Sequence, residues 1–348
     1  MIKEMEMNSF TLRRSIFDGL TFGFLICILL IAVANPTDEE WLNLSKNSLI
    51  VLGSFLFSML LSEFLNRKSI KTLGEALFEP DYKKVVAPEM PWYMTFSKWQ
   101  LIILLITLFV VGIKVTDFSL LKLLDEDGYN GVKRIFTELL NPNFQLLPHA
   151  VLRMFETIFM AFLATAFAIP IAFVLSFMAA KNIMKHPLAF TVYLLIRTLL
   201  NVIRSVEAFM WAIIFSVWVG IGAGAGMLAL MVHSIASLAK QYSEIVETVS
   251  EGPIEGIQAT GASKLQMIWY AIVPQVVLPY ISFTVYRWDI NVRMATIVGF
   301  VGGGGIGKLL IAYQGQAMWR EMGCIFFVIA IVVWLLDQGS AYIREALK

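Results

Sequence analysis

Ionisable side chains interrupt a long apolar run in the last third of the chain. The run covers residues 270–298, and its outer half reads Tyr286-Arg-Trp-Asp-Ile-Asn-Val-Arg293. Ionisable groups inside such a run are costly and indicate a functional site by default. Asp289 and Arg293 are four residues apart, so they can pair on one helical face. Such a pair either locks helix packing or borders a polar route, and both readings stay open.

Arg287 and Asn291 form a second pair at the same spacing, at an angle to the first. Arginine suits oxyanions because its planar fork donates hydrogen bonds in parallel. We therefore expect Arg287, beside the amide of Asn291, to steer an anion. Further charged candidates for such a route are Glu156, which can pair with Arg153, and Arg204, which can pair with Glu207.

A polar, helix-prone segment over residues 243–268 separates two apolar runs. Its glutamates recur at three- and four-residue spacing, which predicts one acidic helical face; they are Glu244, Glu247, Glu251 and Glu255. Gly252-Pro253 is expected to break this helix and start a second one, because proline is favoured at a helix start. An ordinary solvated loop and a partner-binding loop are both compatible with this pattern.

A turn follows within the same segment. Gly261 tolerates left-handed backbone geometry and Ser263 can cap the next helix, while Pro274 is expected to kink that helix where it re-enters the apolar run. A helix laid in a groove is a common mode of docking between proteins, and small residues permit close approach. The residues that would form this docking loop are Glu255, Gly256, Ala259, Thr260, Gly261, Ala262, Ser263 and Pro274.

A glycine run at residues 302–308 imitates a phosphate-binding loop, G-x-x-x-x-G-K. Leu309 stands where that loop needs Ser or Thr to hold magnesium, and the run follows an apolar span rather than a buried strand. We therefore reject nucleotide binding here. A gate or tight re-entrant turn and a flexible external loop remain equally open. The glycines concerned are Gly302, Gly303, Gly304, Gly305 and Gly307.

The composition explains where these motifs must lie. Of 348 residues, 58% are hydrophobic and 15% are charged, against about a quarter charged in soluble domains. The mean hydropathy is +0.73, so the chain is a polytopic membrane protein. A net charge of +1 gives no reason to expect nucleic acid. Two cysteines in apolar runs predict neither a disulfide nor a metal site, and no nucleophile–base set indicates an enzyme.

Apolar runs predict about eight spans and so an all-α helical bundle. They are 16–34, 48–66, 99–116, 150–179, 190–218, 223–241, 270–298 and 322–342. Arg13 and Arg14 precede the first span, which we read as a retained anchor rather than a cleaved signal peptide. The loop at 35–47 is acidic and the next, at 67–98, is basic, so both termini are expected to face the cytoplasm. Residues 1–92, with a proline-interrupted linker (Pro80, Pro88, Pro91), look like an extension of a core at 93–348.

The polar loop resembles the signature loop of ABC importer permeases. That signature has Glu-Ala-Ala, three residues, Gly, nine residues, Ile, one residue and Leu-Pro. Glu255, Gly261 and Pro274 match it in register, whereas Gly256 and Ile257 replace the two alanines and Ala271 and Val273 replace Ile and Leu. The resemblance implies that this loop is a coupling helix seated in a groove of an ATP-hydrolysing subunit.

Residues 95–348 are similar to the phosphonate-type subfamily of these permeases. The segments that carry this similarity are Glu156-Thr157, Arg204–Ala212, Tyr286–Gly307 and Leu336–Arg344. Glu207 stands where that subfamily usually has proline, which removes the expected cause of a helix break there. Asp289 replaces the usual glutamate and keeps its charge.

The resemblance implies a permease core of six spans, with two added N-terminal spans, in the bacterial inner membrane. Its substrate would be phosphonate, phosphite or phosphate. The chain would bind no cofactor; ATP and magnesium would sit on a separate ATPase dimer. The other implied partners are a periplasmic or lipid-anchored substrate-binding protein and a second permease subunit. The alternatives are a permease for methionine or another amino acid, and a secondary transporter that needs no ATPase.

Overall fold

The computed structural model describes residues 2–34, 44–68, 70–78, 95–116 and 125–346, with a few isolated positions between them. Within these residues, eight helices are long and apolar enough to cross a membrane, which confirms the predicted number and the all-α class. The acidic segment at 35–43 and the linker prolines Pro80 and Pro88 lie outside the described residues.

The chain divides into two compact units, Met1–Gly128 and Tyr129–Lys348. The first unit includes the helix at 96–115 together with the two N-terminal spans. The functional division at residue 92 stays a prediction. Each unit is described by itself.

The first unit is held together by buried polar contacts. Its helices are α1 (Ile2–Ala34), α2 (Leu44–Arg67), α3 (Leu73–Phe78) and α4 (Phe96–Val115). The fully buried Asp18 of α1 accepts a hydrogen bond from Gly74 N at 2.8 Å, and Arg14 pairs with Glu75 at 3.0 Å. Gln100 of α4 accepts from Leu73 N at 2.9 Å. These bonds fix the short helix α3 between α1 and α4, because polar groups buried among apolar helices need partners.

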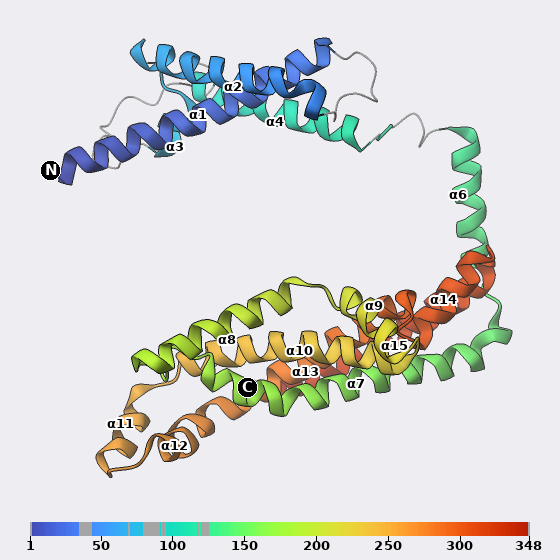
Figure 1. Cartoon of the computed structure of the whole chain (residues 1–348). Coiled ribbons are helices and arrows are strands. Elements are labelled where there is room, and N and C mark those ends of the chain that lie inside the picture. Colours follow the sequence, from blue (N-terminus) through green and yellow to red (C-terminus); the bar gives the residue numbers. More distant parts are fainter. Residues whose placement is uncertain are drawn as a thin grey trace. The chain divides into compact units, whose positions relative to one another are not determined.

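The second unit is a bundle built around α7, α10 and α13, and it includes α6 from Tyr129 onward. Its elements are α6 (Glu126–Leu139), η4 (Phe144–Leu146), α7 (Leu147–Met178), α8 (Pro187–Ser205), α9 (Ala208–Val219), α10 (Ala223–Glu247), α11 (Glu251–Ala259), α12 (Lys264–Met267), η5 (Ile268–Ile272), α13 (Val273–Val298), η6 (Gly299–Val301), α14 (Gly305–Gly315) and α15 (Trp319–Ala346). Figure 1 shows α7, α8, α10 and α13 running along the unit, with α11 and α12 at one end and α14 toward the other.

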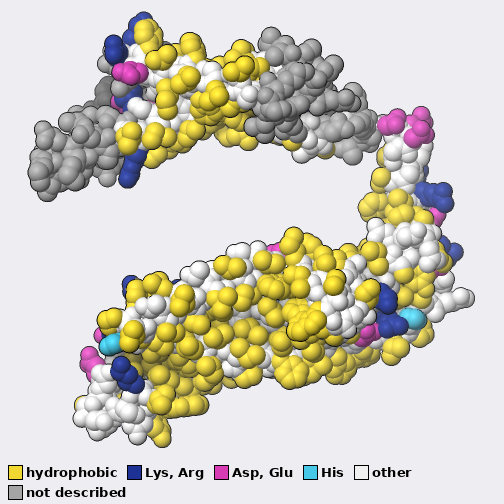
Figure 2. Space-filling model, viewed as in Figure 1, with side chains coloured by type: hydrophobic (Ala, Val, Ile, Leu, Met, Phe, Trp, Pro, Cys, Tyr) yellow, Lys and Arg dark blue, Asp and Glu magenta, His cyan; other side chains and the backbone are white. Residues whose placement is uncertain are grey.

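Small side chains allow the central helices to approach closely. Ala161, Ala164 and Ala168 of α7 are completely buried, as are Ala229 and Ala236 of α10. Helices in membranes associate by packing rather than by a hydrophobic driving force, so small residues gather where backbones meet. Figure 2 shows apolar side chains along the length of the unit and charged ones gathered at its two ends, as expected for a segment that crosses a bilayer.

The predicted span at 190–218 is confirmed only as far as Ser205, because the helix breaks between α8 and α9. Val206 takes an extended conformation (φ −96°, ψ 120°) and Glu207 is the N-cap residue of α9. The Nδ1 atom of His233 lies 3.1 Å from the Val206 carbonyl oxygen that the break leaves free. The break thus forms with glutamate where proline is usual, and a side chain from α10 supplies the hydrogen bond that the helix no longer makes.

Candidate functional site

The polar loop folds as two short helices joined by a tight turn, as its sequence predicts. α11 ends at Ala259, Gly261 has a φ of +79°, and α12 begins at Lys264. Ser263 forms a capping box with Gln266: its backbone N–H donates to the glutamine side chain at 2.8 Å. Glycine at the left-handed position and serine at the N-cap are the local signals that made this turn predictable.

The predicted break of the acidic helix at Gly252-Pro253 is confirmed in kind but lies earlier, so that Glu251 as well as Glu255 belongs to the second helix. α10 ends at Glu247 and α11 begins at Glu251, so the helix breaks before Gly252-Pro253, and Pro253 lies in the first turn of α11. Glu247 instead ties α10 to its neighbours. It accepts hydrogen bonds from Arg197 of α8 and from the Lys181 backbone N–H, both at 2.8 Å.

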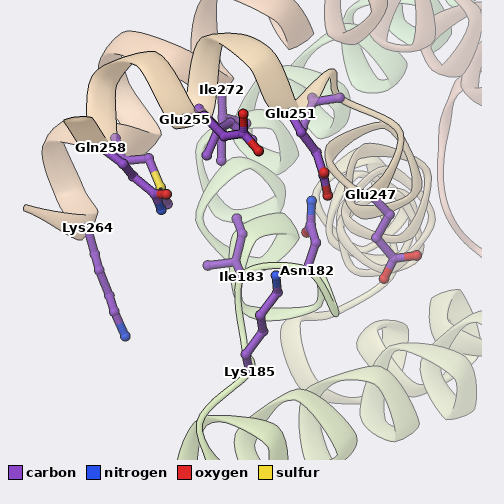
Figure 3. Close-up of a pocket in the computed structure, with 12 residues that line it drawn as sticks. Asn182, Ile183, Lys185, Glu247, Glu251, Glu255, Gln258, Lys264 and Ile272 are labelled. Carbon is purple, nitrogen blue, oxygen red and sulfur yellow. The ribbon is translucent and has the colours of Figure 1, made fainter.

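A pocket of about 400 Å³ lies behind α11. Figure 3 shows Glu251 and Glu255 on one side of it and Lys185 and Ile183, from the segment between α7 and α8, on the other. Since Glu247 also lines it, three of the four glutamates meet around one cavity although they belong to two helices. The cavity thus lies between the 179–186 segment and α11.

The outward face of the turn is open and made of small residues. Glu255, Ala259 and Thr260 are exposed. A side chain added at Gly256 or Gly261 would meet no atom within 4 Å. Ala262 is half-buried and Pro274 is in the first turn of α13, directly after a π-helical turn at Ile268–Ile272. An exposed face of small residues is able to lie flat in a groove of another protein.

A buried polar cluster joins the three central helices in the middle of the second unit. Ser234 of α10 accepts hydrogen bonds from Arg287 Nε at 3.1 Å and from Asn291 Nδ2 at 2.7 Å. Asn291 also donates to Thr165 of α7 at 2.8 Å, and its Oδ1 has no hydrogen-bond partner among the described residues. Arg287 and Asn291 are therefore bridged through Ser234. Ser234 and Thr165 could not be found from the sequence, where both are single hydroxyls in apolar runs.

The predicted pairing of Asp289 with Arg293 is confirmed. Asp289 is 2% exposed and Arg293 is 45% exposed, so the pair reaches from the packed interior to the surface of the unit. The predicted pair between Arg204 and Glu207 does not form in the described structure. The break at Val206 removes the helical spacing that would bring them together, and both side chains remain exposed.

The glycine run forms a tight, buried turn, which agrees with the tight-turn alternative and not with the alternative of a flexible loop. Gly302, Gly304 and Gly305 all have positive φ angles, and Gly303, Gly304, Gly305 and Gly307 are buried. Gly222 N donates to Gly302 O at 2.8 Å, and a Cβ at Gly304 would lie 2.6 Å from Ala223 N. The turn is thus packed backbone to backbone against the start of α10.

Glu156 and Thr157 of α7 hold the other side of this turn. Glu156 pairs with Arg153 at 2.7 Å, as predicted, and its second oxygen accepts from Gly305 N at 3.2 Å. Thr157 Oγ1 accepts from Ile306 N at 2.8 Å. Both side chains satisfy amides at the N-terminus of α14, where free N–H groups attract negative charge. The sequence placed Glu156 in a span but did not indicate that it meets the glycines.

Comparisons with known proteins agree with this fold. The family of binding-protein-dependent transport system inner membrane components matches residues 172–337. A phosphite transport system permease protein of Stutzerimonas stutzeri is 36% identical over 222 residues, 63% of this chain and 80% of the relative. A putative cryptic phosphonate transport system permease protein of Escherichia coli (strain K12) is 44% identical over 119 residues, 34% of this chain and 98% of the relative.

A chain of the inward-facing MetNI methionine ABC transporter superimposes with a TM-score of 0.51. The match covers 59% of this chain and 97% of that chain at 22% identity, so it shows a shared fold. These relatives do not support the alternative of a secondary transporter that works without an ATPase. The chain belongs to the binding-protein-dependent transport system inner membrane components, as a multi-pass, non-catalytic permease subunit of an ABC importer.

Proposed function

We propose that this permease imports a phosphorus oxyanion, namely phosphite, phosphonate or phosphate. The observation that carries the proposal is the buried cluster of Arg287, Asn291 and Ser234 in the centre of the bundle. The names of the relatives from Stutzerimonas stutzeri and Escherichia coli, which specify phosphite and phosphonate, support the same substrate class. The alternative is a permease for methionine or another amino acid.

The cluster suits an oxyanion because its charged donor, Arg287, has no carboxylate bound to it in the described part of the chain. Arg287 is 7% exposed, and no carboxylate lies within 4.0 Å of it among the described residues. Glu207 acts on this charge only from beyond ion-pair distance, and a buried cation without a close counter-charge is costly, so a passing anion would supply one. Asn291 Oδ1 is a buried acceptor without a donor, so it could receive the O–H of a protonated oxyanion. Neutral hydrophobic substrates would satisfy neither group.

The proposed transport cycle needs partners on both sides of the membrane. A substrate-binding protein, periplasmic or lipid-anchored, delivers the anion, and a second permease subunit completes the pathway. Two ATPase subunits bind ATP and magnesium and close on the cytoplasmic face, where we place both termini. The turn between α11 and α12 couples their closure to the bundle, because it leads through α12 and the π-helical turn directly into α13. ATP binding on the ATPase and substrate binding in the bundle would then act on the same equilibrium between two conformations of the permease.

The substrate class is tested by the ATP hydrolysis of the complete importer, assembled with its ATPase and substrate-binding protein in phospholipid nanodiscs. We expect at least one of phosphite, methylphosphonate and phosphate to stimulate hydrolysis, because transport substrates shift the importer toward its closed state. Methionine, added in a parallel titration, should have no effect. Stimulation by methionine and by none of the three oxyanions would reject the proposal in favour of the amino-acid alternative.

The coupling role is tested by Gly256→Leu on the exposed face of α11. The new side chain meets open space within the chain, so the permease should still fold, but it would separate α11 from the floor of a partner's groove. We expect the ATPase to be lost on co-purification and uptake to fall with it. Gly53→Leu in α2, an equally open glycine in the first unit, is the matched control. Wild-type ATPase recovery and uptake with Gly256→Leu would contradict the role.

A further inference from the structure

We infer that α6 is an interfacial helix that lies on the membrane surface at the end of the bundle opposite α11 and α12. Its apolar residues recur at helical spacing and project from one side, where Tyr129, Val132, Phe136 and the following Leu140 are 54–81% exposed. The opposite side carries Arg134 and Glu138, and Lys133 borders the apolar side. A helix with one apolar and one charged face, too polar to cross a bilayer, is typical of the membrane–water boundary.

The direction of α6 supports this placement. Figure 1 shows α6 running across the direction of α7 rather than continuing it. Helices that cross a bilayer lie near its normal, so a helix crosswise to them lies along the surface. In Figure 2 the apolar side chains of α6 face back along the bundle, and its Lys and Arg side chains face the other way. The apolar side therefore faces the position of the bilayer.

Hydrogen bonds hold the C-terminal end of α6 in this position. Asn143 N donates to Arg320 O at 3.1 Å, and Asn143 Nδ2 donates to Glu321 at 3.2 Å. Arg320 Nε donates to Asn141 O at 3.1 Å. The Leu139 backbone also packs against Gly323 so closely that a side chain at residue 323 would collide with it. The end of α6 is thus fastened to the start of α15, a membrane-spanning helix.

Lipid fits the apolar stripe better than a protein partner does. The stripe is narrow and follows a single helix, and it lies at one end of the unit, where charged side chains also gather (Figure 2). Lys133 borders the stripe, where its long stem could cover apolar surface while its ammonium reaches the headgroups. An interfacial helix here would fix the end of α7 that leads to Glu156 and Thr157, and so steady the glycine turn that they hold.

The test is spin labelling of the full-length chain in phospholipid nanodiscs, with cysteine introduced at Val132 or Phe136 on the apolar side. Arg134→Cys and Glu138→Cys are the matched controls on the charged side, and the wild-type chain labelled in parallel gives the background of Cys27 and Cys324. Labels at 132 and 136 should collide with oxygen and be shielded from a water-soluble nickel complex, at a depth of about 5–10 Å. Labels at 134 and 138 should show the reverse.

Three results would overturn the inference. Equal access of the nickel complex to all four labels would place α6 in water. Labels at 132 and 136 that are aqueous alone and become immobile when the substrate-binding protein is added would make the stripe a protein-docking site. Labels shielded from both oxygen and nickel in the permease alone would assign the stripe to a contact within or between permease chains. None of these results depends on which substrate is transported.

Discussion

Replacing Arg287 by methionine should abolish most transport without weakening the fold. A hydrogen bond to a charged group contributes about 1.5–3 kcal/mol, so losing it from the bound anion should lower uptake roughly 10- to 100-fold. The fold should not suffer, because Arg287 is buried without a carboxylate partner among the described residues. An apolar side chain of similar volume avoids the cost of burying that charge, and such exchanges are often neutral or stabilising.

The measurements are uptake by the complete importer and the apparent thermal unfolding temperature of the purified permease. Arg67→Met serves as a control, since Arg67 is an exposed arginine of α2 whose surface pair with Glu63 contributes little to stability. Arg287→Lys should recover part of the activity because it keeps the charge but not the planar fork. A structural role for Arg287 would give a different result: a lower unfolding temperature with methionine, and uptake that falls only in proportion to the folded permease.

Measuring uptake and unfolding temperature separately also distinguishes Arg287 from the neighbouring pair of Asp289 and Arg293. Asp289 is buried and Arg293 is half-exposed, and they satisfy each other. Breaking such a pair leaves a buried charge without a partner, which is strongly destabilising. Arg293 replacements should therefore lower stability as well as uptake, unlike Arg287 replacements. From the sequence, the Asp289–Arg293 pair could either lock helix packing or border a polar route. The geometry of the pair favours the packing role.

The sequence predicts the parts of this molecule that depend on local signals. The number of spans follows from the length of the apolar runs, and the turn at Gly261 and Ser263 follows from a glycine and an N-cap residue. The break at Val206 was missed because neither proline nor glycine marks it; His233, 27 residues away, completes it. The false pair of Arg204 with Glu207 has the same origin, since the prediction assumed a continuous helix.

Contacts between distant segments could not be predicted in the same way. Arg287 and Asn291 were identified as candidates by their polarity within a span, but Ser234 and Thr165, which bind them, have no local signal. Glu156 and the glycine run were both selected, yet nothing in one sequence shows that residues 149 positions apart meet. The sequence thus indicates which groups are unusual, whereas tertiary packing decides what they contact.

Substituting alanine into the glycine turn should give a graded loss that follows the packing of each position. At Gly304 the φ of +77° is unfavourable for alanine, and its Cβ would lie 2.6 Å from the backbone N of Ala223. Neither backbone segment is free to move away, because Gly222 N donates to Gly302 O and Glu156 accepts from Gly305 N. With a ψ of −161°, Gly304 lies in a backbone region that essentially only glycine adopts; another residue there costs about 1–3 kcal/mol, and the collision adds to it.

Gly302→Ala should reduce uptake and stability less than Gly304→Ala does, and Gly315→Ala should change neither. Gly302 lies in the left-handed helical region (φ 95°, ψ 7°), which alanine tolerates better than the conformation of Gly304, and its new Cβ would meet only side chains, of Ile221 and Ser216, at 3.2–3.3 Å. Gly315, in the last turn of α14, faces open space. We expect Gly304→Ala to lose uptake and to lower the apparent unfolding temperature most, with Gly302→Ala intermediate. Equal, small effects at all three positions would mean that the turn can shift to accommodate a side chain. The turn would then not be a rigid contact between α7, α10 and α14.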